Sequence, residues 1–213
     1  MIEYSNTLRR SHLFNLARMR MPLNPIRGLR SLRLSSGFRR FLTNTVFDST
    51  FMLLGVVIGS AFSENADLRV ILATMLVSSL SLGISTGVSV YEAETLEQDK
   101  KISELERALF RNLEETAIAR SAKKTVALVS LVNFFTPLIS CLVTIFPFIL
   151  SAVRVIGIRL AAWLSIALAL AILFVAGAYL GKLGNRNPWV KGLRMLVFGI
   201  VAFVIGYWIE NLI

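Results

Sequence analysis

Long stretches of this chain lack charged residues almost completely. Five stretches are of this kind: 41–62, 70–90, 125–153, 160–181 and 192–213. The first is interrupted only by Asp48, and the last only by Arg194 and Glu210. A helix rises about 1.5 Å per residue, so about 20 apolar residues cross the roughly 30 Å of hydrocarbon in a bilayer. The pattern therefore predicts an all-α membrane protein with five transmembrane helices.

Composition agrees with this prediction and argues against a soluble enzyme. Of 213 residues, 55% are hydrophobic and only 17% are charged. The single cysteine, Cys141, can form neither an intrachain disulfide nor a Cys-based zinc site. The single histidine, His12, lies among arginines, so neither a His-ligated metal centre nor a serine-hydrolase-like triad is expected. We expect no enzyme activity and no permanently bound cofactor.

The basic residues predict how the chain is oriented in the membrane. The net charge of +10 comes largely from residues 1–42, which hold nine arginines and one acid, Glu3. Segments 91–124 and 182–194 are also rich in Lys and Arg, whereas the other connections carry only Arg69, Arg154 and Arg159. Because Lys and Arg concentrate on the cytoplasmic side, we expect a cytoplasmic N-terminus and a C-terminus on the opposite side. We therefore expect the basic residues to contact membrane lipid, and we expect no nucleic-acid partner.

Four parts of the chain follow from these patterns. They are a basic N-terminal arm (1–40), transmembrane helices one and two (41–90), a cytoplasmic acidic helical segment (91–124) and transmembrane helices three to five (125–213). The arm is rich in Arg and Ser and poor in acids, as a mitochondrial or chloroplast transit peptide is. We favour the alternative that it lies on anionic lipid.

The acidic segment has no Gly or Pro and should continue helically out of the second span, as one long helix or a helical hairpin. Its glutamates could collect divalent cations at the cytoplasmic side, because carboxylate oxygens are ligands for such ions. The candidates are Glu92, Glu94, Glu97, Glu104, Glu106, Glu114 and Glu115. Lys and Arg in the same segment nearly balance the acids, which is equally typical of an ordinary solvated, salt-bridged helix.

Asp48 is the sharpest feature of the first span, since a carboxylate among apolar residues of a membrane helix is costly and usually faces protein or water. Met52 follows one turn later, and Gly55 and Gly59 continue the same face as a seam for close helix packing. We expect this face to hold a membrane metal site and a homodimer contact. Two alternatives are that Asp48 caps the start of the helix, and that Gly177-x-x-x-Gly181 forms the dimer seam.

Hydroxyl residues follow one another along the second and third spans. In the second span, the spacing of Ser79, Thr86 and Ser89 places them on one helix face. Such a face either lines a path for ions or packs against another helix. We add Thr86 and Ser89 to the predicted membrane metal site. In the third span Pro137 should bend the helix and free a carbonyl, which a neighbour, water or an ion must satisfy. Its polar face comprises Asn133, Pro137, Ser140 and Thr144.

Several short motifs resemble the vacuolar iron transporter family. Phe47-Asp48-Ser49-Thr50 and Leu54-Gly55-Val56-Val57-Ile58-Gly59 are similar to the start and the glycine-rich body of its first helix. Ser79-Leu80-Ser81-Leu82 and Gly87-Val88-Ser89-Val90 resemble its second helix. Arg186-Asn187-Pro188-Trp189 resembles its closing stretch. The resemblance covers residues 41–213 and is strongest to a shorter prokaryotic branch.

The resemblance implies a dimeric five-span transporter that exports Fe(II) or Mn(II) from the cytosol in exchange for protons. It implies that Asp48 takes part in metal passage and that the glutamates match a cytoplasmic metal-binding region. Leu82 and Thr86 stand where the family has a methionine and a glutamate. The rival hypothesis is a non-transporting membrane scaffold or assembly factor whose cytoplasmic helix binds a partner.

Overall fold

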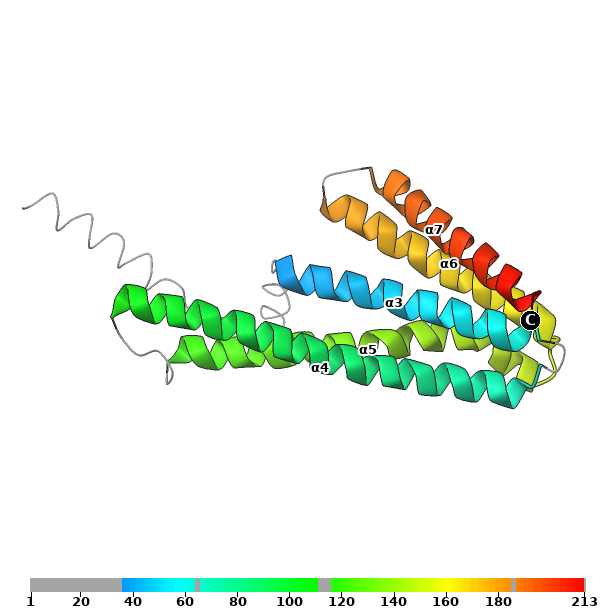
Figure 1. The fold of residues 1–213 in the computed structure, drawn as a ribbon, viewed down its shortest axis with the longest axis horizontal. Coiled ribbons are helices and arrows are strands. Elements are labelled where there is room, and N and C mark those ends of the chain that lie inside the picture. The colour runs from blue at the N-terminus through cyan, green and yellow to red at the C-terminus, as the bar shows by residue number, and fades with distance from the viewer. Residues whose placement is uncertain (1–35, 64–65, 111–115, 185–186, 213) are drawn as a thin grey trace, which may run out of the picture. The chain divides into compact units, whose positions relative to one another are not determined.

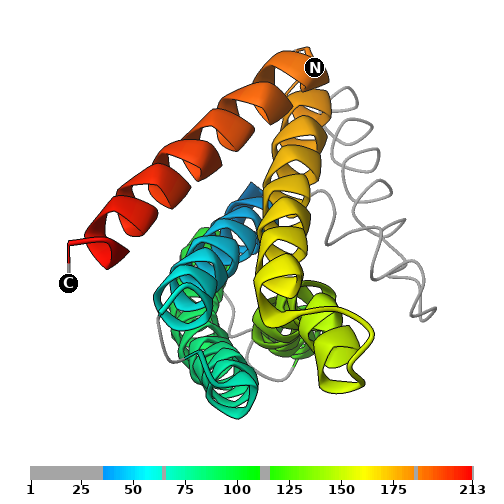
Figure 2. The same ribbon diagram turned by 90° about the vertical axis from the view of Figure 1, so that its right-hand side faces the viewer.

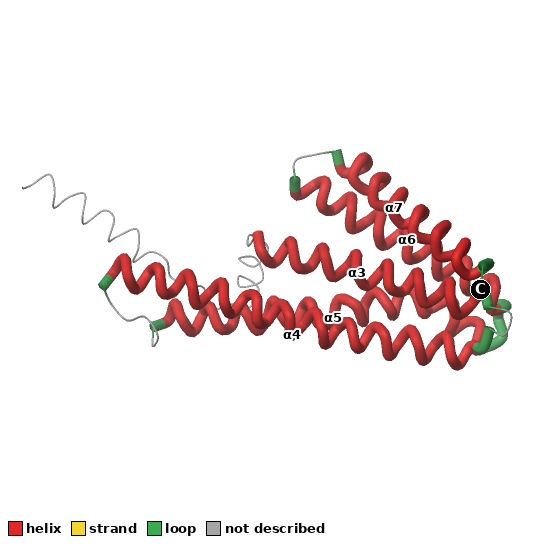
Figure 3. Tube along the Cα trace, viewed as in Figure 1, coloured by secondary structure: helices red, strands yellow, loops and turns green. Residues whose placement is uncertain are grey.

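The computed structural model describes residues 36–63, 66–110, 116–184 and 187–212, and all regular structure there is helical (Figures 1 and 3). The helices are α3 (Ser36–Ala61), α4 (Leu68–Leu109), α5 (Ala117–Ala152), α6 (Ile158–Leu183) and α7 (Pro188–Glu210). All five are long and apolar enough to cross a membrane. The predicted all-α class with five spans is confirmed, and the protein is an integral membrane protein. The predicted basic arm lies outside the described residues, apart from its last few positions at the start of α3.

Helices α4 and α5 are longer than a bilayer requires and lie side by side (Figures 1 and 2). With 42 residues, α4 measures about 63 Å, roughly twice the hydrocarbon thickness. It runs without interruption past Val90 to Leu109, so the predicted helical continuation is confirmed. The segment 91–124 is therefore built mainly from the ends of two spans, in place of a separate acidic insert. Its cytoplasmic location stays a prediction.

The middle of α5 binds α4 through a carbonyl that a proline sets free. Pro137 has no N–H, so the carbonyl of Asn133, one turn earlier, loses its helical partner. The hydroxyl of Thr86 on α4 lies 3.3 Å from that carbonyl oxygen, and it shares its one proton between this acceptor and the carbonyls of Leu82 at 2.8 Å and Gly83 at 3.2 Å in its own helix. The expectation that a neighbour satisfies the freed carbonyl is confirmed at Asn133.

The same region of α5 binds α3 through side chains. Thr45 donates its hydroxyl to Oδ1 of Asn133 at 2.9 Å, and the Ser49 hydroxyl donates to Ser140 Oγ at 3.2 Å. All four residues are buried. Hydrogen bonds between membrane helices replace bonds to water that lipid cannot supply. The polar face expected on the third span is therefore an internal packing surface.

Helix α3 contacts each of the other four helices and carries much of the apolar core. Leu53 and Leu54 of α3 belong to one buried cluster with Met75 of α4, Phe148 of α5 and Leu173 of α6. Viewed from the end, α7 leans outward beside α6 (Figure 2). The core thus lies around one side of α3, on the side of α5 and α6.

Glycines bring α6 and α7 close together. A Cβ on Gly177 would lie 2.8 Å from Met195 Cγ and 2.9 Å from the Lys191 carbonyl oxygen. A Cβ on Gly181 would lie 2.7 Å from Cα of Pro188. Such distances leave no room for a side chain, so α7 already occupies the Gly177-x-x-x-Gly181 seam within one chain. This seam is not free to pair a second copy.

Replacing Thr86 by valine should destabilise the protein by about 0.6–1.7 kcal/mol, because it leaves the Asn133 carbonyl without its cross-helix donor. Equilibrium unfolding in detergent measures this difference. The control is Thr74→Val on the same helix, where the hydroxyl bonds only to the Val70 carbonyl of its own helix and the side chain is exposed. Equal stability of the two variants would contradict the role assigned to Thr86.

The predicted orientation is tested with single cysteines at Ser103, exposed near the end of α4, and Leu212, exposed beyond α7. A membrane-impermeant thiol reagent added to sealed vesicles should label one site from outside and the other only after permeabilisation. Cys141 is buried and serves as the unlabelled background. Labelling of both sites from one side would rule out five membrane crossings.

Candidate functional site

One face of α3 is left uncovered by the other helices of the chain. Its opposite face, with Ser49, Leu53 and others, is buried. Asp48, Gly55 and Gly59 are exposed, and their spacing of seven and four residues places them along one line of the helix. The sequence-predicted carboxylate and glycine seam therefore share one open surface.

Asp48 lies well inside α3, which begins at Ser36. The alternative that it caps the start of the helix is wrong for this reason. Among the described residues, Asp48 takes part in no hydrogen bond or ion pair. A carboxylate facing lipid at this position would be costly, so protein or water must cover it in the membrane.

Met52 lies one turn beyond Asp48 and is half-buried, with its side chain packed partly against the apolar core. Its side chain is therefore neither fully enclosed in the core nor fully open. Asp48 and Met52 are the two residues of α3 that the sequence assigned to a membrane site, and that assignment stays a prediction.

The hydroxyl residues that we expected on one face of the second span have different surroundings in the structure. Ser79 is fully buried and donates to the Met75 carbonyl, whereas Ser89 is exposed. Thr86 is directed toward α5, where its hydroxyl binds the Asn133 carbonyl. Among the described residues, no hydrogen bond links Thr86 or Ser89 to Asp48. Of the two hydroxyls assigned to the metal site, Ser89 alone is on an open surface of α4.

Sequence reasoning missed other hydroxyl residues on that open surface. Thr74, Ser81 and Ser85 are exposed like Ser89, and they are spaced seven, four and four residues apart. This spacing keeps them on one face of a helix. The signal was present in the sequence, but the same intervals also fit the buried line through Ser79.

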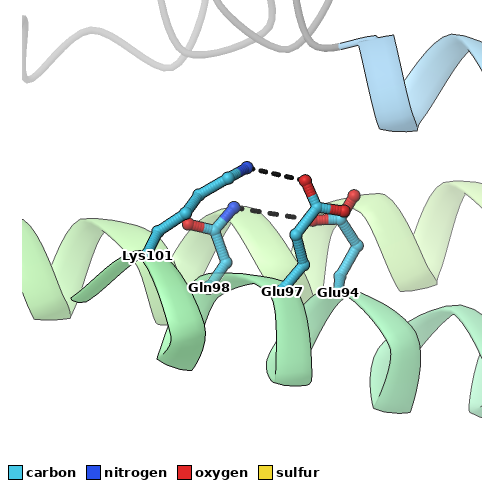
Figure 4. Close-up of polar contacts among 4 residues, drawn as sticks. All are labelled: Glu94, Glu97, Gln98 and Lys101. Carbon is cyan, nitrogen blue, oxygen red and sulfur yellow. Dashed lines mark hydrogen bonds and ion pairs between the residues drawn. The ribbon is translucent and has the colours of Figure 1, made fainter. Parts of the chain in front are cut away.

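The acids near the end of α4 occupy different surroundings (Figure 4). Glu94 is only 3% exposed and accepts a hydrogen bond from Gln98 Nε2 at 3.5 Å, while Glu97 pairs with Lys101 at 2.7 Å. Glu106 is half-buried, and Glu92 and Glu104 are exposed. Glu94 therefore packs inside the bundle and belongs to no solvated face of the helix.

The structure does not assemble these acids into a metal site within one chain. Among the described residues, no group of three or more His, Cys, Asp or Glu side chains is close enough to hold an ion. Glu114 and Glu115 lie outside the described residues. Glu92 lines an open, mostly apolar groove of about 670 Å³ between α4 and α5, together with Gly87, Tyr91, Ser130 and Phe134.

The sequence was compared with known protein families and with curated proteins. The sequence model of the VIT family, the vacuolar iron transporters, matches residues 109–211. The match covers a little under half of the chain, from the end of α4 through α7. The family resemblance predicted from the motifs is confirmed.

One relative of this chain is the uncharacterized protein MJ0645 of Methanocaldococcus jannaschii. The two are 25% identical over 175 residues, which cover 81% of this chain and 88% of the relative. The family match begins at Leu109, so α3 with Asp48 lies before the matched residues. The family match suggests metal ion transport and a transporter in place of an enzyme. The assignment of Asp48 rests on its position in the structure.

Replacing Gly55 by leucine should disrupt pairing between two copies while leaving each chain folded, because nothing lies within 4 Å of a Cβ at this position. The expected result is a shift from dimer to monomer by light scattering in mild detergent. Gly177→Leu is the contrasting variant, since its side chain would collide with Met195 and misfold the chain. A Gly55→Leu variant as dimeric as the unmodified protein would exclude this face as the dimer contact.

Proposed function

We propose that this protein is a homodimeric transporter of Fe(II) and Mn(II), which exports them from the cytosol in exchange for protons. The observation that carries the proposal is the uncovered Asp48. It is a carboxylate within an apolar span, exposed on the single chain and without a partner among the described residues. A membrane helix keeps such a residue when it faces protein or a path for ions.

The chemistry of the open face suits a transition-metal cation. Asp48 supplies a hard, negatively charged oxygen, and Met52 supplies a soft thioether one turn away. This combination favours Fe(II) or Mn(II) over Mg²⁺, which prefers oxygen ligands alone. Protonation of the carboxylate removes the charge that attracts the cation, so proton binding and metal release can alternate at one group.

A second copy would complete the site. The glycines at positions 55 and 59 leave α3 without side chains beside Asp48, which lets another helix approach closely. Two such faces meeting about a two-fold axis would bring two carboxylates and two thioethers together. This arrangement would shield the charges from lipid and supply more ligands than one chain offers.

The cytoplasmic acids act as a collecting surface in this proposal. Glu92 and Glu104 are exposed and can attract cations directly, and the proposal extends to Glu106, Glu114 and Glu115. Glu97 is engaged by Lys101, and Glu94 is buried, so both must change partners before they bind a cation. Loss of one collecting acid should therefore be compensated by the others.

Asp48→Asn should abolish Mn(II) movement in liposomes containing the purified protein, because it removes the charge but keeps the volume and a hydrogen-bonding oxygen. Glu104→Gln is the matched control, which removes one charge from the cytoplasmic surface and should lower uptake by less than about tenfold. Size-exclusion profiles of both variants check that the fold is retained.

Transport by Asp48→Asn at the unmodified rate would remove Asp48 from the mechanism. Absence of Fe(II) and Mn(II) flux from the unmodified protein, with and without a pH gradient, would contradict the transporter itself and support the scaffold hypothesis.

A further inference from the structure

The C-terminal end of α7 packs against the C-terminal end of α3. A Cβ on Gly206 would lie 3.1 Å from Ile58 Cδ1, so the two helices touch there. One residue on, the ring of Tyr207 meets the ring of Phe62 edge-on, with centroids 5.7 Å apart. These contacts determine which way the last turn of α7 faces.

That last turn places Glu210 over the open face of α3. Oε2 of Glu210 lies 3.9 Å from the position that a Cβ on Gly59 would take, so the carboxylate stands directly in front of this glycine. Gly59 is exposed, and so is Asp48, eleven residues earlier on the same helix. Eleven residues are close to three full turns, so the two positions share one line about 16 Å apart along the axis.

Glu210 has no structural task that the packing of α7 would explain. Among the described residues, no hydrogen bond or ion pair holds its carboxylate. The carboxylate is half-buried near the end of an apolar helix, where an ionised group is costly unless it serves a purpose. Among the described residues, the other acid at this end of the bundle is Asp67, which caps α4 by accepting a hydrogen bond from the Arg69 backbone N–H at 2.8 Å.

We propose that Glu210 is a second cation-binding residue of the transport path, at the end of α3 opposite to the acids of α4. This inference rests on the proposed function and extends it. A cation leaving Asp48 moves along the face of α3 past Gly55, where nothing lies within 4 Å of a Cβ, and reaches Gly59. The carboxylate of Glu210 offers the next negatively charged oxygen on that line. Both carboxylates lie on one chain, so each copy in a dimer would contribute one pair.

The experiment measures initial rates of Mn(II) transport by the full-length protein in liposomes. Glu210→Gln should lower the rate about tenfold at low Mn(II), because the path loses the charge that concentrates cations at this end. Asp67→Asn is the matched control. It removes one negative charge at the same end but keeps an oxygen that can cap α4, and it should transport normally.

A second variant separates charge from packing. Glu210→Cys should transport slowly, an anionic methanethiosulfonate reagent should restore the rate, and a cationic reagent should not. The unmodified protein controls for the reagents, since Cys141 is buried.

An unchanged rate for Glu210→Gln would overturn the inference. Equal losses in Glu210→Gln and Asp67→Asn, or equal effects of the two reagents, would overturn it as well, because general surface charge or packing would then explain the result. In all these cases the unmodified protein still transports Mn(II), so the proposed function survives. Absence of Mn(II) transport by the unmodified protein would contradict both.

Discussion

The bundle depends on one constraint, which is that polar groups within hydrocarbon must find partners inside the protein. Pro137 makes this constraint acute, because it leaves the Asn133 carbonyl free in the middle of α5. Thr86 of α4 binds this carbonyl and Thr45 of α3 binds the side chain of the same residue. Asn133 thus joins three helices at one level of the membrane. The apolar cluster around Leu53 joins α3 to α4, α5 and α6, and the polar contacts add direction, because each needs a particular partner on the facing helix.

The buried polar side chains that join the helices have hydrogen-bond partners inside the bundle, so the exposed polar side chains need a different explanation. Ser49 and Asp48 are adjacent in sequence, yet Ser49 is bonded to Ser140 in the interior and Asp48 is exposed. If the chain needed only to pack, an apolar residue at position 48 would cost less. The alternation between an internal and an external polar residue therefore separates, on the same turn of helix, the residue that packs α3 against α5 from the residue to which the proposed function assigns the cation.

The sequence was sufficient to predict the spans, because charge-free length is a direct requirement of the bilayer. It also predicted the helix beyond Val90, since nothing in that segment interrupts a helix. It could not predict the direction in which Thr86 points, because helical spacing gives the angle between residues and not the neighbour at that angle. The two glycine seams illustrate the same limit. Gly55 and Gly177 lie in similar small-residue patterns, but the fold fills one seam with α7 and leaves the other open.

One glycine seam is filled within the chain and the other is open, and this difference affects where an ion path across the membrane could lie. In a single chain, the face of α3 that carries Asp48 and Gly55 is open, so ions moving along this face would meet lipid. If a second copy covers the face, the path lies between two chains and exists only in the dimer. Packing within a chain and pairing of two chains then use different glycines: those of α6 and α7 fix the shape of each chain, and Gly55 of α3 stays open to a second copy. A substitution that separates the copies would consequently abolish transport without unfolding the chain, whereas one between α6 and α7 would remove both.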